Sequence, residues 1–269
     1  MLDLYLGGRI SREDDLYFLR KFAKFDSGVK DAGFTFQYVC EPLPELDAYL
    51  PRELTKCEKK DFENMMRLMI WVHNALIPDG VVIPIVPLNS LNILEKTKTD
   101  RIKSNCWMFS VVLNEIFLSL GYRSRLVRCM PFDLRFNDCH CVVQAYVEQC
   151  QKWVTFDPAF GTYYCNEQKI PLNLKEIREY IIREESVLTP LVPMKYSKSL
   201  IPYWIKNSFR FESYAVSKFG AESDTCDTVL YSLLPVGYEL TDKTIVYKNR
   251  KLQVMHTHNE SDFWEEQKG

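Results

Sequence analysis

Cys106 stands where a thiol can become a nucleophile, at the start of a strongly helical stretch. Apolar side chains recur at helical spacing after Ser104, and Gly121 ends the pattern. A helix N-terminus stabilises a thiolate through its dipole and its free backbone N–H groups, and Arg101 and Lys103 add positive potential. This placement predicts a reactive thiol, with a buried structural cysteine at a helix start as the alternative.

A base and a carboxylate follow Cys106 at the right places along the chain. His140 opens one predicted strand, and Asp157 directly follows a second one over residues 153–156. Antiparallel pairing of these strands brings His140 to within a residue or two of Asp157, and opposed residues in such a pair have Cβ atoms about 4.5–5.5 Å apart. One register parity places both side chains on the face toward the start of the Cys106 helix. Nucleophile, base and orienting carboxylate are the groups that thiol catalysis needs.

The sequence around these residues resembles the transglutaminase-like superfamily over about residues 60–165. The resemblance implies a papain-like α+β core and a Cys-His-Asp triad of Cys106, His140 and Asp157. It also implies acyl transfer on amides, by transamidation or by peptide hydrolysis. Three ordered blocks carry it: Asn105-Cys106-Trp107 with Leu118–Tyr122 and Arg125, then the His140 strand, then Trp153–Pro158.

Some positions depart from the family pattern. Ser104 stands where the family usually has glycine, and Cys141-Val142 follows the histidine in place of a small aromatic or polar pattern. Arg123-Ser124 occupies a stretch in which the family commonly has proline. All three residues of the expected triad are present, but the choice of substrate does not follow from the resemblance.

The expected mechanism needs an oxyanion hole next to the nucleophile. The backbone N–H of Cys106 is one donor, and Asn89, Asn92 and Trp107 are the candidates for the second. Trp107 is also the predicted substrate-binding residue, because it adjoins the nucleophile, although core packing is the alternative. An amine or water then resolves the thioester.

Helices and short strands must position these groups. The patterns predict helices over residues 11–24, 60–76, 105–120 and 174–183, and strands over 34–39, 125–130, 141–147 and 153–156. Further strands are predicted over 209–216, 228–234, 244–247 and 252–255, as an antiparallel meander. This order indicates an α+β fold in which the nucleophile helix packs on an antiparallel sheet. The expected domains are an N-terminal helix-strand preface (1–55), a transglutaminase-like catalytic core (56–192) and a β-rich C-terminal extension packed on it (193–269).

Two histidine groups suggest metal sites, but neither pattern favours one. In Cys139-His140-Cys141, alternation along a strand points the cysteines to one face and the histidine to the other. His256 and His258 could bind a metal from one strand face, but two imidazoles are a weak signal, and a solvated pair is favoured. We therefore expect no metal and no cofactor.

Composition limits the classes of function. The chain has 269 residues, 46% hydrophobic and 26% charged, and its net charge is −2, which argues against disorder and against a nucleic-acid partner. The longest apolar stretch, residues 81–88, is short and contains two prolines, so no membrane span and no signal peptide are expected. Nine cysteines, an odd number, indicate reduced thiols in the cytoplasm. We expect a protein or peptide substrate, leave the oligomeric state open, and keep a catalytically silent binding module as the alternative.

Overall fold

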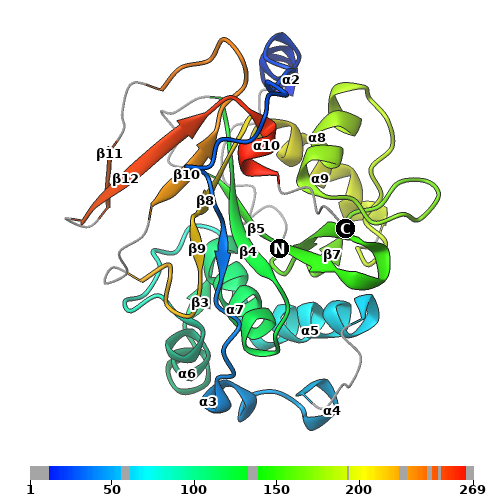
Figure 1. Ribbon diagram of the computed structural model, residues 1–269. Coiled ribbons are helices and arrows are strands. Elements are labelled where there is room, and N and C mark those ends of the chain that lie inside the picture. The colour runs from blue at the N-terminus through cyan, green and yellow to red at the C-terminus, as the bar shows by residue number, and fades with distance from the viewer. Residues whose placement is uncertain are drawn as a thin grey trace.

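An eight-stranded sheet forms the centre of the part of the chain that the computed structural model describes, which is residues 12–55, 61–132, 139–192, 194–223, 229–240, 244–247 and 250–264 (Figure 1). One of its inner strands, over residues 140–147, is buried along its whole length. The strands follow one another across the sheet in the order β11 (Thr244–Tyr247), β12 (Arg250–Thr257), β10 (Leu230–Leu233), β8 (Arg210–Tyr214), β4 (Ser124–Met130), β5 (His140–Val147), β6 (Lys152–Asp157) and β7 (Thr162–Tyr163).

Helices cover both faces of this sheet. On one face, α5 (Phe62–Ala75), α6 (Ser90–Asp100) and α7 (Cys106–Ser119) share a core with the odd-numbered residues of β5. On the other, α2 (Arg12–Lys21), α8 (Leu174–Ile182) and α9 (Met194–Asn207) share a core with Val142 of the same strand. Side chains alternate between the faces of a strand, so β5 contributes to both cores. The α+β fold class is confirmed.

The helix that carries the nucleophile candidate is the most deeply buried one. Its residues 108–118 are all buried, and they are mostly apolar. Asn105 is the N-cap, and its side-chain oxygen accepts a hydrogen bond from the backbone N–H of Met108. Burial on nearly every side fixes the position of the first turn of α7, which the capping bond completes.

The predicted hairpin of β5 and β6 is present. A short 3-10 helix, η1 (Glu148–Cys150), and Gln151 in the left-handed region connect the two strands. The strands pair antiparallel with Val143 opposite Phe156. By continuation of this register, His140 and Asp157 lie diagonally to each other on one face of the sheet.

That shared face differs from the predicted one. The His140 ring contacts aromatic residues of the core formed with α8 and α9, whereas α7 packs on the opposite face. His140 is the first residue of β5 and α7 begins beside that strand end, so the imidazole interacts with Cys106 although its ring lies on the other face of the sheet. The interaction of His140 with Cys106 therefore depends on the place of His140 at the end of β5 more than on the sheet face that its ring occupies.

The segment after residue 193 extends the same sheet. β8 pairs with β4, so its strands continue the sheet that carries the hairpin. One expectation for this segment was wrong: β10 pairs with β12 in parallel, so the strands are not a purely antiparallel meander. The helix α9 at its start was not predicted from the sequence. Residue 228, which began one predicted strand, lies outside the described residues.

Other predictions differ in extent. The predicted strand over residues 34–39 is only β1 (Gln37–Tyr38), which pairs in parallel with β9 (Val216–Ser217). The helix α6 was not predicted from the sequence. Short elements complete the described part: α3 (Pro44–Asp47), α4 (Arg52–Thr55), β2 (Ile77–Pro78), β3 (Lys103–Ser104) and α10 (Glu260–Phe263).

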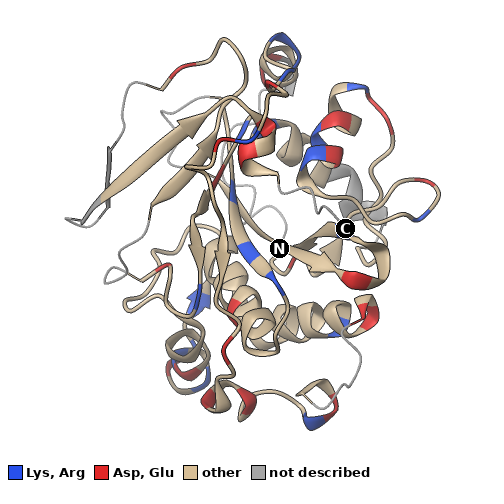
Figure 2. Ribbon diagram, in the orientation of Figure 1, with Lys and Arg blue, Asp and Glu red and all other residues tan. Residues whose placement is uncertain are grey.

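Charges of both signs are interspersed on the outer helices. Figure 2 shows Lys or Arg next to Asp or Glu on α2, α6 and α8. Among the described residues, no helix has both the length and the apolar character that crossing a membrane requires.

Candidate active site

Cys106 is the first residue of α7, and its thiol lies beside the start of β5. Its Sγ is 3.7 Å from the carbonyl oxygen of Cys139. One helical turn later, Ser110 Oγ donates a hydrogen bond of 2.8 Å to the carbonyl oxygen of Cys141. These contacts join the first turn of α7 to the strand end where His140 stands. The Cys106 side chain itself is only partly buried.

His140 and Asp157 form a buried pair. His140 Nε2 lies 2.7 Å from Asp157 Oδ2, and both side chains are almost completely inaccessible to solvent. Asp157 Oδ2 also accepts a hydrogen bond of 2.6 Å from Tyr164 Oη, and Oδ1 accepts one of 3.2 Å from the backbone N–H of Phe160. Three donors compensate the burial of the carboxylate, which leaves it able to orient the imidazole ring.

Aromatic rings hold the imidazole of His140 from several sides. The ring centroids of Tyr203, Phe160 and Trp204 lie 5.0, 5.2 and 5.4 Å from that of His140. Tyr203 Oη is 3.5 Å from His140 Nδ1, the nitrogen that does not face Asp157. Tyr203 and Trp204 belong to α9, so the segment after residue 193 contributes to the site. Sequence reasoning considered Trp204 as a cleft residue but favoured core packing, and it missed Tyr203, because no motif distinguishes it from ordinary core aromatics.

The surroundings of Cys106 favour its thiolate. A hydrogen bond with the Cys141 side chain, and after it a hydrogen bond and Coulombic attraction with His140, lower the pKa of Cys106 to about 5, against the opposing effect of burial. Burial alone would lower the pKa of His140, but the charge and hydrogen bond of Asp157 and the interaction with Cys106 raise it to about 10. Both shifts favour a thiolate–imidazolium pair.

Trp107, the predicted substrate-binding residue, is fixed by a charged pair. Its indole Nε1 donates a hydrogen bond of 2.8 Å to Glu222 Oε2. Glu222 also forms a buried ion pair with Arg128, whose guanidinium lies 4.9 Å from the centroid of the Trp107 ring. The ring is partly exposed next to Cys106. The Trp107 side chain is therefore held in place beside Cys106.

Comparison with known proteins identifies this part of the chain. A model of the Transglutaminase-like superfamily matches residues 48–158. These residues are therefore similar to the core of that superfamily. The match contains Cys106, His140 and Asp157.

Among solved structures there is a more distant likeness to this chain. One is the crystal structure of a presumed cysteine protease from Cytophaga hutchinsonii, with 15% sequence identity and a TM-score of 0.33. The likeness covers 51% of this chain and 46% of that chain, so it spans less than half the length of the other protein. No curated protein matches the chain significantly.

The candidates for a second oxyanion donor in the transglutaminase-like core are mostly engaged elsewhere. Asn92 Nδ2 donates to the carbonyl oxygen of Pro87 at 2.8 Å, and Asn89 caps α6 by accepting from the backbone N–H of Asn92. The indole N–H of Trp107 donates to Glu222. The backbone N–H of Cys106, at the start of α7, remains as the donor that the fold itself provides.

A loop next to the start of α7 exposes apolar side chains. The backbone N–H of Asp79 donates to the carbonyl oxygen of Ser104 at 2.8 Å, and Asn105 Nδ2 donates to that of Val82 at 3.0 Å. Within residues 79–88, three aliphatic side chains project into solvent with large exposed fractions: Val81 (70%), Ile83 (80%) and Val86 (54%). Three such residues within one short loop form an apolar surface beside Cys106.

Two histidines outside this site each contact an oxygen atom of the protein, one a carbonyl oxygen and the other a carboxylate. His73 Nδ1 is 3.0 Å from the carbonyl oxygen of Pro158, and His258 Nε2 is 3.1 Å from Glu239 Oε1. Throughout the described ranges, no group of three or more His, Cys, Asp or Glu side chains is placed to hold a metal ion. Cys139, just before β5, and Cys141 both belong to the core shared with α7, whereas the His140 ring contacts Trp204 of the other core, which is the alternation that the sequence suggested.

Proposed function

We propose that this protein is a thiol enzyme that transfers or hydrolyses the acyl group of an amide or peptide bond. Cys106 is the nucleophile, His140 the general base and acid, and Asp157 the residue that orients the imidazole. The observation that supports this most strongly is the buried His140, hydrogen-bonded to Asp157 at 2.7 Å and interacting with a thiol at a helix N-terminus.

The reaction begins with attack of the Cys106 thiolate on the carbonyl carbon of the amide. The carbonyl oxygen becomes an oxyanion, to which the backbone N–H of Cys106 donates. Collapse of this intermediate breaks the C–N bond, and the imidazolium of His140 gives its proton to the departing amine. The thioester is then attacked by an amine, which gives a new amide, or by water, which gives a carboxylic acid. His140 accepts the proton of the attacking group, and the thiolate is restored.

A protein or peptide substrate is supported by the apolar loop over residues 79–88. An extended chain lying over Cys106 can place an aliphatic side chain against Val81 and Ile83, which lie open to solvent in the free protein. The described cysteines are all free thiols, which supports the proposal that the enzyme works in the cytoplasm.

The proposal is tested by labelling with iodoacetamide as a function of pH, with the modified cysteine located by peptide mapping. We expect Cys106 to label fastest at neutral pH, with an apparent pKa well below the free-thiol value of about 8.5. Cys150, which is exposed, is the internal reference for an ordinary accessible thiol. Equal rates at Cys106 and Cys150 would contradict catalysis and favour a silent module that binds peptides.

A second measurement connects the reactive thiol to acyl transfer. The protein is incubated with a library of peptides, and acyl-enzyme adducts on Cys106 are sought by mass spectrometry of intact protein quenched in acid. We expect a mass increase that disappears in Cys106→Ala and decays faster when an amine is added. A mass increase of equal size in Cys106→Ala would exclude Cys106 as the acceptor.

A further inference from the structure

Three free thiols lie together where α7 begins beside β5. Cys106 is the first residue of the helix, and Cys139 and Cys141 stand at the start of the strand, in the core that α7 shares with the sheet. Cys106 Sγ is 3.7 Å from the carbonyl oxygen of Cys139. One helical turn further on, Ser110 Oγ donates to the carbonyl oxygen of Cys141 at 2.8 Å. The three cysteines therefore form one cluster, on the sheet face that α7 covers.

The side chains of this cluster differ in their access to solvent. Cys106 and Cys139 are partly exposed, whereas Cys141 is 0% exposed. Hydrogen bonds join the thiol of Cys141 to Cys106 and to Cys139. A small oxidant in solution can therefore reach Cys106, but Cys141 reacts only with a group that is already beside it inside the protein.

The protonation states of two of these thiols set the order in which they react. The hydrogen bond from Cys141, together with the interactions with His140, lowers the pKa of Cys106 to about 5, so its sulfur is a thiolate at neutral pH. The same hydrogen bond, then the one with Cys139 and burial, raises the pKa of Cys141, which keeps its proton. Oxidation starts at thiolates that solvent can reach. Cys106 is therefore the first of the cluster to be oxidised.

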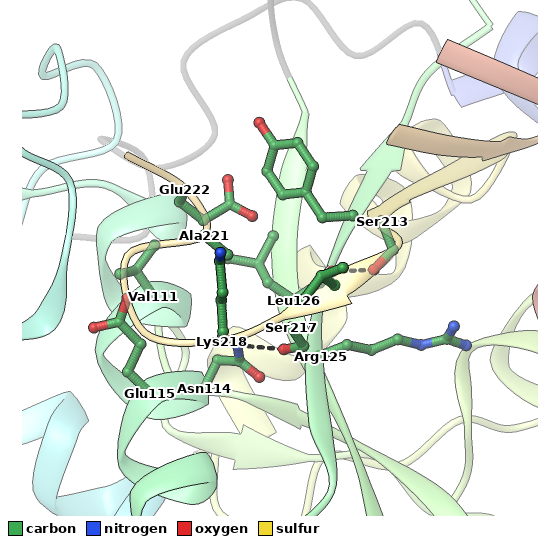
Figure 3. Close-up of a pocket in the computed structure, with 12 residues that line it drawn as sticks. Val111, Asn114, Glu115, Arg125, Leu126, Ser213, Ser217, Lys218, Ala221 and Glu222 are labelled. Atoms are coloured by element: carbon green, nitrogen blue, oxygen red, sulfur yellow. Dashed lines mark hydrogen bonds between the residues drawn. The ribbon is translucent and has the colours of Figure 1, made fainter. Parts of the chain in front are cut away.

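The other described cysteines lie outside this cluster. Cys129 belongs to the core on the opposite face of the sheet, and Cys165 lies beyond β7. Cys40 contacts the chain just past the end of α7, and Cys150 is exposed in η1, past the far end of β5. The pocket that Glu222 borders has no cysteine in its lining (Figure 3). Within the described part of the chain, this leaves the two cysteines at the start of β5 as partners for the α7 thiol.

We propose that Cys106 and Cys141 form a reversible disulfide when the protein meets hydrogen peroxide, with Cys141 as the resolving cysteine. The Cys106 thiolate attacks one peroxide oxygen and the O–O bond breaks, so two electrons pass from sulfur to the peroxide. Cys106 becomes a sulfenic acid, and the departing hydroxide takes the proton of the His140 imidazolium and leaves as water. The sulfur of Cys141 then attacks the sulfenic sulfur. The S–S bond forms, and the sulfenic hydroxyl leaves as a second water with the proton of Cys141.

This disulfide protects the thiol on which the proposed function rests. A sulfenic acid that meets no second thiol is oxidised further to a sulfinic acid, which is irreversible for most proteins. In the disulfide, the sulfur of Cys106 is the partly exposed one, so an external dithiol can attack it and release both cysteines. Disulfides of this transient kind are those found in reducing compartments. Acyl transfer would stop during exposure to peroxide and resume after reduction.

The test begins with the purified full chain in submillimolar hydrogen peroxide. Remaining thiols are blocked with N-ethylmaleimide in acid, and unreduced peptides are mapped by tandem mass spectrometry. We expect a peptide with Cys106 linked to the one that contains residues 139–141, with fragments that assign the link to Cys141. Iodoacetamide labelling of Cys106 should be lost and should return with dithiothreitol. A link to Cys139, or a sulfinic acid at Cys106 without a link, would overturn the proposal.

Substitutions in the cluster test the role of each thiol. Cys141→Ser keeps a side chain of similar size that can donate to Cys106, and Cys141→Ala is the second variant, without a buried hydroxyl. In both we expect the linked peptide to be absent, and the fraction of labelling that dithiothreitol restores to fall at least about fivefold. Each variant is compared with its own labelling rate before peroxide. Cys139→Ser is the matched control and should link and recover as the wild type does. A link that persists in either folded Cys141 variant would contradict the assignment.

Formation of acyl adducts separates this inference from the proposed function. If Cys106 forms acyl adducts with peptides but never links to Cys141, only the inference is overturned. If Cys106 links reversibly to Cys141 but never forms an acyl adduct, the acyl transfer is overturned and the redox site stands.

Discussion

His140 Nε2 lies 2.7 Å from Asp157 Oδ2, although the two residues do not stand directly opposite each other in the β5–β6 hairpin. A diagonal pair on one sheet face is close enough for two long polar side chains to meet. The remaining nitrogen of the imidazole, Nδ1, is then free of the carboxylate and available to the thiol and to Tyr203.

Asp157→Asn should reduce the reactivity of Cys106 without removing the thiol. The asparagine amide group can donate a hydrogen bond to His140 Nε2, whereas the Asp157 carboxylate only accepts one. The substitution therefore favours the wrong imidazole tautomer and removes the negative charge beside His140. We expect turnover to fall by roughly 10²–10⁴ and the apparent pKa of Cys106 to rise. The labelling rate at neutral pH and peptide turnover measure both effects.

Tyr164→Phe is the matched control for that substitution. It removes one of the three donors to Asp157 and keeps the charge, so it should lower turnover by about tenfold or less. A loss as large as that of Asp157→Asn would show that the hydroxyl of Tyr164, and not the carboxylate charge, controls the site.

Acyl transfer should have a bell-shaped pH profile. The thiolate is lost as pH falls through the pKa of Cys106, about 5, and the imidazolium is lost as pH rises through the pKa of His140, about 10. We expect kcat/KM to be highest between these limits, because the ion pair exists only there. Measurement of kcat/KM from pH 4 to pH 11 checks this, and a rate that increases steadily up to pH 9 would indicate an ordinary thiol instead.

The ion pair of Glu222 and Arg128 should matter for stability. Both side chains are largely buried, so Glu222→Ala leaves a buried guanidinium without its carboxylate partner. We expect a loss of about 3–5 kcal/mol in the free energy of unfolding in urea. Glu184→Ala breaks an exposed pair with Arg20 and should cost less than about 1 kcal/mol. Similar losses for the two variants would contradict this assignment.

Glu115 should make stability depend on pH. Burial raises the pKa of its carboxyl group to about 7, although the carboxylate accepts hydrogen bonds from the backbone N–H groups of Ser90 and Gly220. Because the folded pKa lies above the unfolded one, the stabilisation is fully present below about pH 4.5 and is lost as pH rises through about 7. The expected decrease is at most about 3 kcal/mol.

Glu115→Gln cannot ionise, so the difference between wild type and variant isolates this effect. We expect the free energy of unfolding of the variant to change less than that of the wild type between pH 5 and pH 8. Glu53→Gln, on the surface, should keep the dependence of the wild type. Parallel curves for wild type and Glu115→Gln would show that another group titrates.

The loop over residues 79–88 should influence substrate choice without affecting the thiol. The double variant Val81→Ser and Ile83→Ser removes two exposed aliphatic side chains, so kcat/KM should fall about tenfold for peptides with an aliphatic residue near the scissile bond. The rate of iodoacetamide labelling at Cys106 should stay the same, because this reagent needs no side-chain contact. Val29→Ser, at a residue that is 95% exposed and far along the chain, is the control.

Local patterns in the sequence determined the elements that carry the site. The helix α7 was predictable from its apolar spacing and its end at Gly121, and the hairpin from the two strand segments that precede Asp157. These signals depend on residues a few positions apart, which is the range over which backbone periodicity and capping act. The helix α6 was missed because its exposed face is polar and only four of its residues are buried: Ser90, Ile93, Leu94 and Thr97.

Only the tertiary structure decided what surrounds those elements. Tyr203 reaches His140 from α9, and Glu222 reaches Trp107 from beyond β9, over large separations along the chain. The parallel pairing of β10 with β12 is likewise non-local. The sequence therefore determined which residue types could do chemistry and in which order they occur. The packing of distant helices and strands determined their neighbours, because a contact between remote segments depends on the whole core and leaves no local pattern.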